Sequence, residues 1–324
     1  LCWWMKFSLN HWRVSMKKMK IWFASSEAAP FAKTGGLADV AGSLPKALKK
    51  LGVDIRVVLP KYRQIPPEYV NKMRFVGYTY VDLSWRHEYC GIFTLEHEGI
   101  PFYFLDNERF FNRDWYYGQP DEGERFAFFS KAVLEVLPVI KFKPWIIHCN
   151  DWQTGLVPIF LDAHYRNFRN KGFFQSMHTI MTIHNLKYQG VFPKVMMDDI
   201  LGLSWDYFHQ EGIEFHDNIN YLKAGIAYAT KVTTVSKTYA EEIQTDFYGE
   251  NIAGITRKRA GDLIGIVNGI DYEHNDPLAD KRLYASYSAD SLEGKRTNKL
   301  SLQKDMNLEV NADIPVIGLI SRLV

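Results

Sequence analysis

Short apolar runs alternate with amphipathic stretches along most of this chain. Residues 21–24, Ile-Trp-Phe-Ala, predict a buried first strand, and residues 54–60 predict a second strand. The helix between them is predicted from apolar positions that recur at helical spacing: Leu37, Val40, Ala41 and Leu44. A strand, a helix and a strand within about thirty residues or a little more make one right-handed crossover unit. The pattern therefore predicts a parallel sheet.

The alternation continues to residue 267 and is interrupted once, by a predicted hairpin. Apolar runs on both sides of Glu98-Gly99, within residues 89–105, predict two antiparallel strands. The later elements are predicted as helix 122–140, strand 145–149, helix 155–165, strand 179–183, helix 218–229, strand 231–235, helix 237–244 and strand 263–267. Strands that alternate with helices are typical of a doubly wound sheet. We therefore predict an α/β fold with a Rossmann-like doubly wound parallel sheet.

The two ends of the chain depart from this pattern. Residues 1–18 contain no uninterrupted apolar core and no small-residue cleavage site, so we expect an extension outside the fold rather than a signal peptide. Residues 315–320 have the pattern of a central strand but no helix follows them, so we expect a second domain that is cut short. The best linker candidate is 268–280, which is rich in turn residues. The predicted domains are 19–265 and 266–324.

Length, charge and cysteine content narrow the class of protein. A chain of 324 residues favours two domains, and its formal net charge of +2 provides no global field to hold nucleic acid. The apolar stretch 126–140 contains charged residues and a proline, so no membrane span is expected. Three cysteines without a C-x-x-C pair argue against a disulfide framework and a structural zinc site. A cytoplasmic location fits this composition best, or a plastid if the source is a plant, although no transit peptide is evident.

Polar residues gather where several predicted strands end, which is where ligands bind in open parallel sheets. Lys33-Thr34-Gly35-Gly36 stands just before a predicted helix N-terminus, where backbone amides and the helix dipole favour a phosphate. An ordinary turn with a solvated lysine is the alternative reading. Neither G-x-G-x-x-G nor GxxxxGK[ST] occurs, which argues against a dehydrogenase or a kinase of the usual types.

Asp151 and His184 each follow a predicted strand closely, so a carboxylate and an imidazole are expected around one crevice. The alternative is that His184 and the nearby His148 are ordinary core histidines. A metal site that adds Cys149 to these residues has no diagnostic spacing. Tyr117 is a candidate for stacking on a sugar ring, or it is a plain surface aromatic, and the aromatic stretch 204–215 either lines a glycan groove or packs a loop.

Seven short segments in order are more specific than any one of these features. They are SSEAAPFAKTGGLADV at 25–40, HCNDW at 148–152, TIHNLKYQG at 182–190, YLKAGI at 221–226, TVSKTYA at 234–240, VNGID at 267–271 and SRL at 321–323. Together they resemble the bacterial glycogen synthase and plant starch synthase family, which extends α-1,4-glucan with ADP-glucose. The resemblance runs from about Met19 to Val324.

This resemblance implies a GT-B glycosyltransferase with two Rossmann-like domains, of which the chain holds the N-terminal one and a truncated second one. Its catalytic residues would be His184, Asp151 and Arg322, with Arg322 neutralising the leaving diphosphate. The implied substrate-binding residues are Lys33, Gly35, Gly36, Asp39, Tyr117, Asn185 and Asn268. The implied partners are ADP-glucose and glycogen or starch, with no metal and no other cofactor.

Departures from the family pattern keep two alternatives open. The family's motifs continue beyond Val324, so the chain alone is expected to be inactive. In the family a tryptophan usually follows the Asn-Gly-Ile-Asp motif, where this chain has His274-Asn275. One alternative is another retaining two-domain glycosyltransferase that uses UDP-glucose. The other is a glucan-binding fragment without catalysis.

Overall fold

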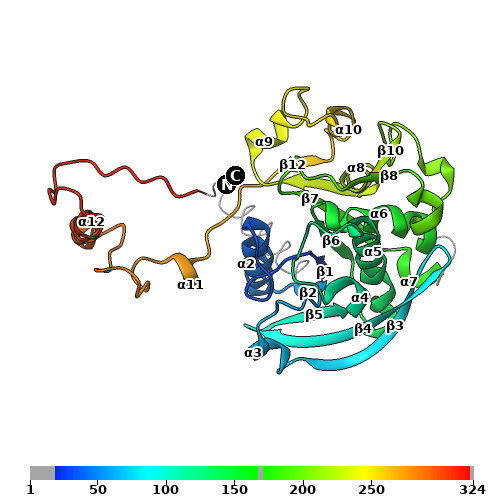
Figure 1. The fold of residues 1–324 in the computed structure, drawn as a ribbon, viewed down its shortest axis with the longest axis horizontal. Helices are drawn as coiled ribbons and strands as arrows, with labels where there is room; N and C mark the ends of the chain where they lie inside the picture. Colours follow the sequence, from blue (N-terminus) through cyan, green and yellow to red (C-terminus); the bar gives the residue numbers. More distant parts are fainter. Residues whose placement is uncertain (1–18, 167–170, 322–324) are drawn as a thin grey trace, which may run out of the picture. The chain divides into compact units, whose positions relative to one another are not determined.

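The computed structural model describes residues 19–166 and 171–321 (Figure 1). Contacts divide the chain between Asn268 and Gly269 into two compact units. The expected extension 1–18 lies outside the described residues. The domain boundaries drawn from the sequence stay a prediction.

Within the described residues, the first unit is built on a nine-stranded sheet with the order β12-β11-β7-β6-β1-β2-β5-β4-β3. The neighbouring strands from β12 to β5 are parallel, and β4 and β3 continue the sheet antiparallel. The strands are β1 (Lys20–Ala24), β2 (Asp54–Pro60), β3 (Arg74–Leu83), β4 (Arg86–His97), β5 (Ile100–Asp106), β6 (Ile146–Asn150), β7 (His178–Ile183), β11 (Lys231–Thr234) and β12 (Leu263–Gly265). The predicted α/β fold with a doubly wound, mostly parallel sheet is confirmed.

Helices connect the parallel strands in two directions. The chain moves from β1 through α2 (Gly36–Lys50) to β2, and later from β6 through α6 (Leu156–Phe160) to β7 on the other side of β1. Because crossovers are right-handed, helices that lead in opposite directions cover opposite faces of the sheet. Figure 1 shows α2 and the pair α5 (Glu122–Val139) and α6 on different sides of it.

The other short elements lie in the connections between the main strands. They are α3 (Pro67–Val70), α4 (Glu108–Phe111), η1 (Trp152–Thr154), η2 (Leu161–Arg166), α7 (Lys171–Phe174), η3 (Met197–Leu201), η4 (Trp205–Tyr207), α8 (Tyr221–Tyr228), α9 (Lys237–Glu242) and α10 (Ala253–Lys258). A small antiparallel sheet is formed by β8 (Val191–Pro193), β10 (Asn218–Asn220) and β9 (Glu214–Phe215).

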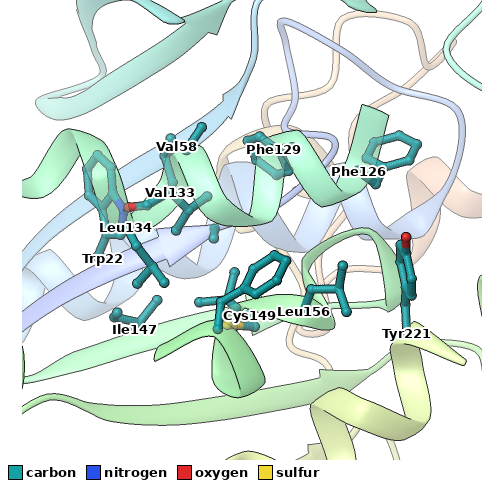
Figure 2. Packing of buried hydrophobic residues seen from close by; sticks show 14 of the residues in the cluster. Trp22, Val58, Phe126, Phe129, Val133, Leu134, Ile147, Cys149, Leu156 and Tyr221 are labelled. Atoms are coloured by element: carbon teal, nitrogen blue, oxygen red, sulfur yellow. The ribbon is translucent and has the colours of Figure 1, made fainter. Parts of the chain in front are cut away.

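The core lies between α5 and the parallel strands (Figure 2). Trp22 of β1 is fully buried, and its indole N–H donates to the carbonyl oxygen of Val133 at 3.0 Å. Phe129 and Val133 of α5 belong to the same buried cluster as Ile147 of β6, and all three are fully buried. Burying each side chain of this size stabilises the fold by about 1.5–3 kcal/mol relative to leaving it exposed. This packing holds α5 across β1 and β6, the two strands at which the chain changes direction.

The predicted hairpin is confirmed, because β4 and β5 pair around a two-residue turn at Glu98-Gly99. Both turn residues have positive φ, 49° and 75°, as a type I′ turn requires. Strand β3, which pairs with β4 and extends the sheet, was not predicted.

The prediction of a helix at 218–229 is wrong for its first three residues. Asn218–Asn220 forms strand β10 and pairs with β8. The Asn220 side chain then accepts the N–H of Lys223 at 2.9 Å and caps α8, which begins at Tyr221. A good N-cap residue therefore starts the helix later than the apolar periodicity indicates.

In the second unit, the described residues form two helices, α11 (Tyr272–Asn275) and α12 (Glu293–Asp305), and no strand. The strand predicted at 315–320 is absent, and Ile317, Leu319 and Ile320 are almost completely exposed. The prediction is wrong for this structure because a strand needs a neighbour to pair its backbone groups, and the described part of the unit offers none.

Candidate active site

The sheet changes direction between β1 and β6, because the chain continues from β1 toward β2 and β5 but from β6 toward β7 and β11. Ligands in open α/β sheets bind beyond the carboxyl ends of the strands at such a switch point. The residues that follow β1, β6 and β7 are Ser25-Ser26-Glu27, Asp151 and His184-Asn185. The geometry therefore places the predicted Asp151 and His184 at the expected edge.

Asp151 joins the ends of β6 and β7. Its carboxylate Oδ1 accepts the backbone N–H of His184 at 2.8 Å, and the Asn185 backbone also hydrogen-bonds to this carboxylate. Asp151 has a positive φ of 55°, an uncommon conformation for a residue other than glycine. Burial raises the pKa of Asp151 to about 7, and the negative charge of Glu27 contributes to the increase. The site thus holds a carboxyl group that can gain or lose its proton near neutral pH.

The His184 ring lies against the last residue of β6. Its Nε2 atom is 3.0 Å from Oδ1 of Asn150. Burial lowers the pKa of His184 to about 4, so the imidazole is neutral at pH 7. Asn185, the next residue, is exposed, and its side-chain oxygen accepts the N–H of Lys187 at 3.0 Å.

Glu27 is a buried carboxylate that the sequence analysis did not select. Its Oε2 accepts the N–H of Thr34 at 2.5 Å, and its Oε1 accepts the hydroxyls of Thr34 and Tyr117, both at 2.7 Å. The Tyr117 hydroxyl also lies 3.0 Å from Oγ of Ser26. Glu27 therefore links the loop after β1 to the loop that carries Tyr117. The signal in the sequence was the polar triplet 25–27 directly after a buried strand.

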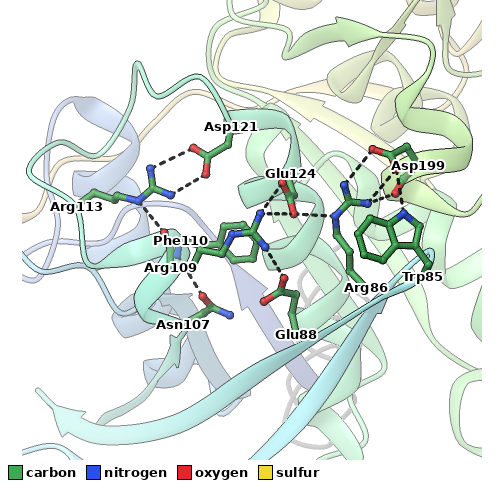
Figure 3. A network of polar contacts seen from close by, with 10 residues as sticks. All are labelled: Trp85, Arg86, Glu88, Asn107, Arg109, Phe110, Arg113, Asp121, Glu124 and Asp199. Carbon is green, nitrogen blue, oxygen red and sulfur yellow. Dashed lines mark hydrogen bonds and ion pairs between the residues drawn. The ribbon is translucent and has the colours of Figure 1, made fainter.

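The segment that carries Tyr117 is held by charged groups (Figure 3). Arg113 donates to Asp121 at 2.7 Å, and Arg109 donates to Glu124 at 3.0 Å. The fully buried Arg125 donates through Nε to the carbonyl oxygen of Phe110 at 2.8 Å. These contacts fix both ends of the loop and leave Tyr117 half-buried over the end of β1.

The N-terminus of α2 is open. Gly35 is its N-cap, with no side-chain capping bond, and a Cβ atom built on Gly35 or Gly36 would meet nothing within 4 Å. Lys33 pairs with Asp39 at 2.6 Å, and both side chains are more than half exposed. The unpaired N–H groups of a helix start favour an anion, and here a lysine and two glycines stand beside them.

One candidate residue stays apart from this cluster, and another lies outside the described residues. Asn268 is exposed and follows β12, and no side-chain contact joins it to Asp151 or His184 in the described part of the chain. Arg322 lies outside the described residues.

His148 is part of the interior of the sheet. Its Nε2 is 2.7 Å from Oγ1 of Thr182, and its ring packs edge-on against Phe23 with centroids 4.7 Å apart. Burial lowers the pKa of His148 to about 3. Among residues 19–166 and 171–321, no group of three or more His, Cys, Asp and Glu side chains is arranged to hold a metal ion.

Comparison with known proteins points to one family. Residues 20–258 match the family described as starch synthase catalytic domain. The chain is 48% identical over 306 residues to a glycogen synthase of Alkaliphilus metalliredigens and 52% identical over 306 residues to one of Caldicellulosiruptor saccharolyticus. Each alignment covers 94% of this chain and 64% of the relative.

A solved structure shares the fold. The catalytic domain of starch synthase IV from Arabidopsis thaliana, bound to ADP and acarbose, matches with a TM-score of 0.80 and 33% identity. The match covers 90% of this chain and 59% of that one. The chain thus spans less than two thirds of the length of each of these relatives.

In the described part of the chain, no helix is both long and apolar enough to cross a membrane. With the family match covering most of the chain, this chain belongs to the starch synthase catalytic domain family.

Proposed function

We propose that the protein containing this chain transfers glucose from ADP-glucose to the non-reducing end of an α-1,4-glucan, with retention of configuration. The observation that carries the proposal is the hydrogen bond between Asp151 and His184 at the switch point of the sheet. On the proposed account, the glucose of the donor lies at this bond and its diphosphate lies at the start of α2. The glucan, glycogen or starch, approaches from the Tyr117 loop.

The donor diphosphate would be held by the groups around the N-terminus of α2. Gly35 and Gly36 leave room for the phosphates, and the N-cap residue makes no side-chain capping bond to the first N–H groups of the helix. Lys33 would exchange its exposed partner Asp39 for a phosphate oxygen, an exchange that costs little because exposed ion pairs are weak. Arg322 would neutralise the leaving diphosphate, and Asn268 would lie on the nucleotide side.

The glucosyl group would be held by the polar residues that follow β6 and β7. A neutral His184 offers a hydrogen bond without adding charge, and Asn185 offers an exposed amide. The Asp151 carboxylate fixes the backbone of both residues. Transfer with retention develops positive charge on the sugar while a diphosphate departs, so prepositioned charges and dipoles stabilise that state. The proposal therefore needs no metal ion and no cofactor besides the donor.

A donor competition assay tests this function. The intact protein is given glycogen with radiolabelled ADP-glucose, and unlabelled UDP-glucose is added at increasing concentration. We expect label in the glucan and little competition from UDP-glucose. Label that disappears with equimolar UDP-glucose would support the UDP-glucose enzyme instead. Retention of glycogen without any transfer from either donor would support a glucan-binding protein.

A further inference from the structure

Asn150 is the last residue of β6 and is almost fully buried, with 1% of its surface exposed. Its amide nitrogen donates to the carbonyl oxygen of Ala24 at 3.0 Å and to that of His148 at 3.4 Å. Turning the amide over would place its oxygen against two carbonyl oxygens, which cannot donate. The orientation of the amide is therefore determined by β1 and β6, and Oδ1 faces His184.

This orientation decides where the proton of His184 resides. Nε2 of His184 lies 3.0 Å from Oδ1 of Asn150, and an amide oxygen only accepts hydrogen bonds. Nε2 must therefore carry the hydrogen. Because desolvation keeps the partly buried ring neutral at pH 7, the ring has only one N–H, and Nδ1 keeps its lone pair.

We propose that Asn150 is a positioning residue that holds His184 in the Nε2–H tautomer and thereby presents Nδ1 as an acceptor for a hydroxyl group of the transferred glucose. This inference rests on the proposed function for the identity of the ligand, but the tautomer itself does not. Asn150 acts through His184 and does not touch the sugar. The backbone of the same loop is fixed separately by Asp151, so ring and backbone have different supports.

The tautomer is tested by nitrogen NMR of the intact protein labelled with 15N-histidine. His184 is assigned as the signal that is lost in His184→Gln. We expect a pyrrole-type shift at Nε2 and a pyridine-type shift at Nδ1 of His184 at pH 7. The reverse pattern in the wild-type protein would overturn the proposal. This measurement stands even if the wild-type protein transfers no glucose, a result that would reject only the proposed function.

Two substitutions separate positioning from a purely structural role. Asn150→Leu removes both the donor and the acceptor, whereas Asn150→Asp loses the amide donor but keeps an oxygen that faces Nε2. We expect Asn150→Leu to change the His184 shifts and to lower kcat about tenfold, which corresponds to one lost hydrogen bond. Asn150→Asp should keep the pyrrole-type shift at Nε2 and lose less kcat than the leucine variant.

A structural role would affect the two variants alike, since both lose the donor to Ala24 and His148. Equal losses of kcat with unchanged His184 shifts would therefore contradict the proposal. If Asn150→Leu does not fold, the wild-type and Asn150→Asp spectra still decide the question. The matched control is Asn107→Leu, a buried asparagine that caps α4 and donates to the carbonyl oxygen of Tyr89. It should leave the His184 shifts as they are.

Discussion

The carboxylate of Asp151 accepts the backbone N–H of His184 at 2.8 Å and so joins the ends of two adjacent parallel strands. Burial raises the pKa of this partly buried carboxyl group from the ordinary 3.8 to about 7. This carboxyl group holds the loop at residues 184–185 and also lies at the switch point where a ligand is expected. Its protonation links the stability of the fold to the geometry of the site.

Asp151 should make the protein less stable as pH rises. Its pKa is higher in the folded than in the unfolded state, so its contribution is present below pH 4 and is lost as pH rises toward 7. In Asp151→Asn this loss, at most about 1.4 kcal/mol per pH unit between pH 4 and 7, should disappear. Urea denaturation of both proteins at pH 5 and pH 8 measures it. Equal pH dependence in the two proteins would show that the carboxyl group does not titrate in this range.

His148 should have the opposite effect. Its folded pKa of about 3 lies below the ordinary 6.5, so its stabilising contribution is present above pH 6.5 and is lost as pH falls. His148→Phe removes the titration, and Thr182 keeps a hydroxyl partner in Thr233 at 2.6 Å. The variant should lose less stability than the wild type between pH 7 and pH 5, as measured by urea denaturation. If the variant lost as much stability as the wild type between pH 7 and pH 5, the prediction for His148 would be wrong.

Lys33→Ala should impair donor binding without harming the fold. The ion pair with Asp39 is exposed and contributes less than about 1 kcal/mol, so the melting temperature should change little. The KM for ADP-glucose should rise about tenfold or more, because a phosphate contact is lost. Lys194→Ala, which breaks an exposed pair with Asp217, is the matched control and should keep the wild-type KM. The same KM in both variants would remove Lys33 from the donor site.

Gly35→Ala tests whether the open space at the start of α2 belongs to the ligand. The added methyl group meets no protein atom within 4 Å, and Gly35 has an extended backbone that alanine adopts. The melting temperature should therefore stay close to the wild-type value while affinity for ADP-glucose, measured by calorimetry, falls. Gly254→Ala is equally unhindered but lies in α10, so it should leave affinity unchanged. Unchanged affinity in Gly35→Ala would place the diphosphate elsewhere.

Much of the fold could be predicted because apolar runs mark buried strands directly. The structure has β1 and β2 where strands were predicted at 21–24 and 54–60. It has α5 where a helix was predicted at 122–140. The alternating segment 74–83 was missed, and it has a half-exposed face at the edge of the sheet. The strand predicted at 315–320 is absent although the segment is apolar. An apolar segment forms a strand only where another strand lies beside it.

The site could be predicted only as separate pieces. Asp151 and His184 were predicted as site residues because each follows a predicted strand. No spacing in the sequence indicates that the Asp151 carboxylate accepts the backbone N–H of His184. Glu27 was missed as a site residue because its partner Tyr117 is ninety residues away in the sequence and the contact depends on the fold. The role of Asn150 also depends on the carbonyl groups of two strands, which a sequence pattern does not report.

The most direct test of the account is glucose transfer by Asp151→Asn. The intact wild-type protein and the variant are compared at saturating ADP-glucose with glycogen as acceptor, and incorporation of labelled glucose is measured. Asp199→Asn, which alters the half-exposed carboxylate paired with Arg86, is the control. The account predicts a loss of about a hundredfold or more in kcat for Asp151→Asn and a nearly wild-type rate for the control. A wild-type rate in Asp151→Asn would contradict the placement of the reaction at the ends of β6 and β7.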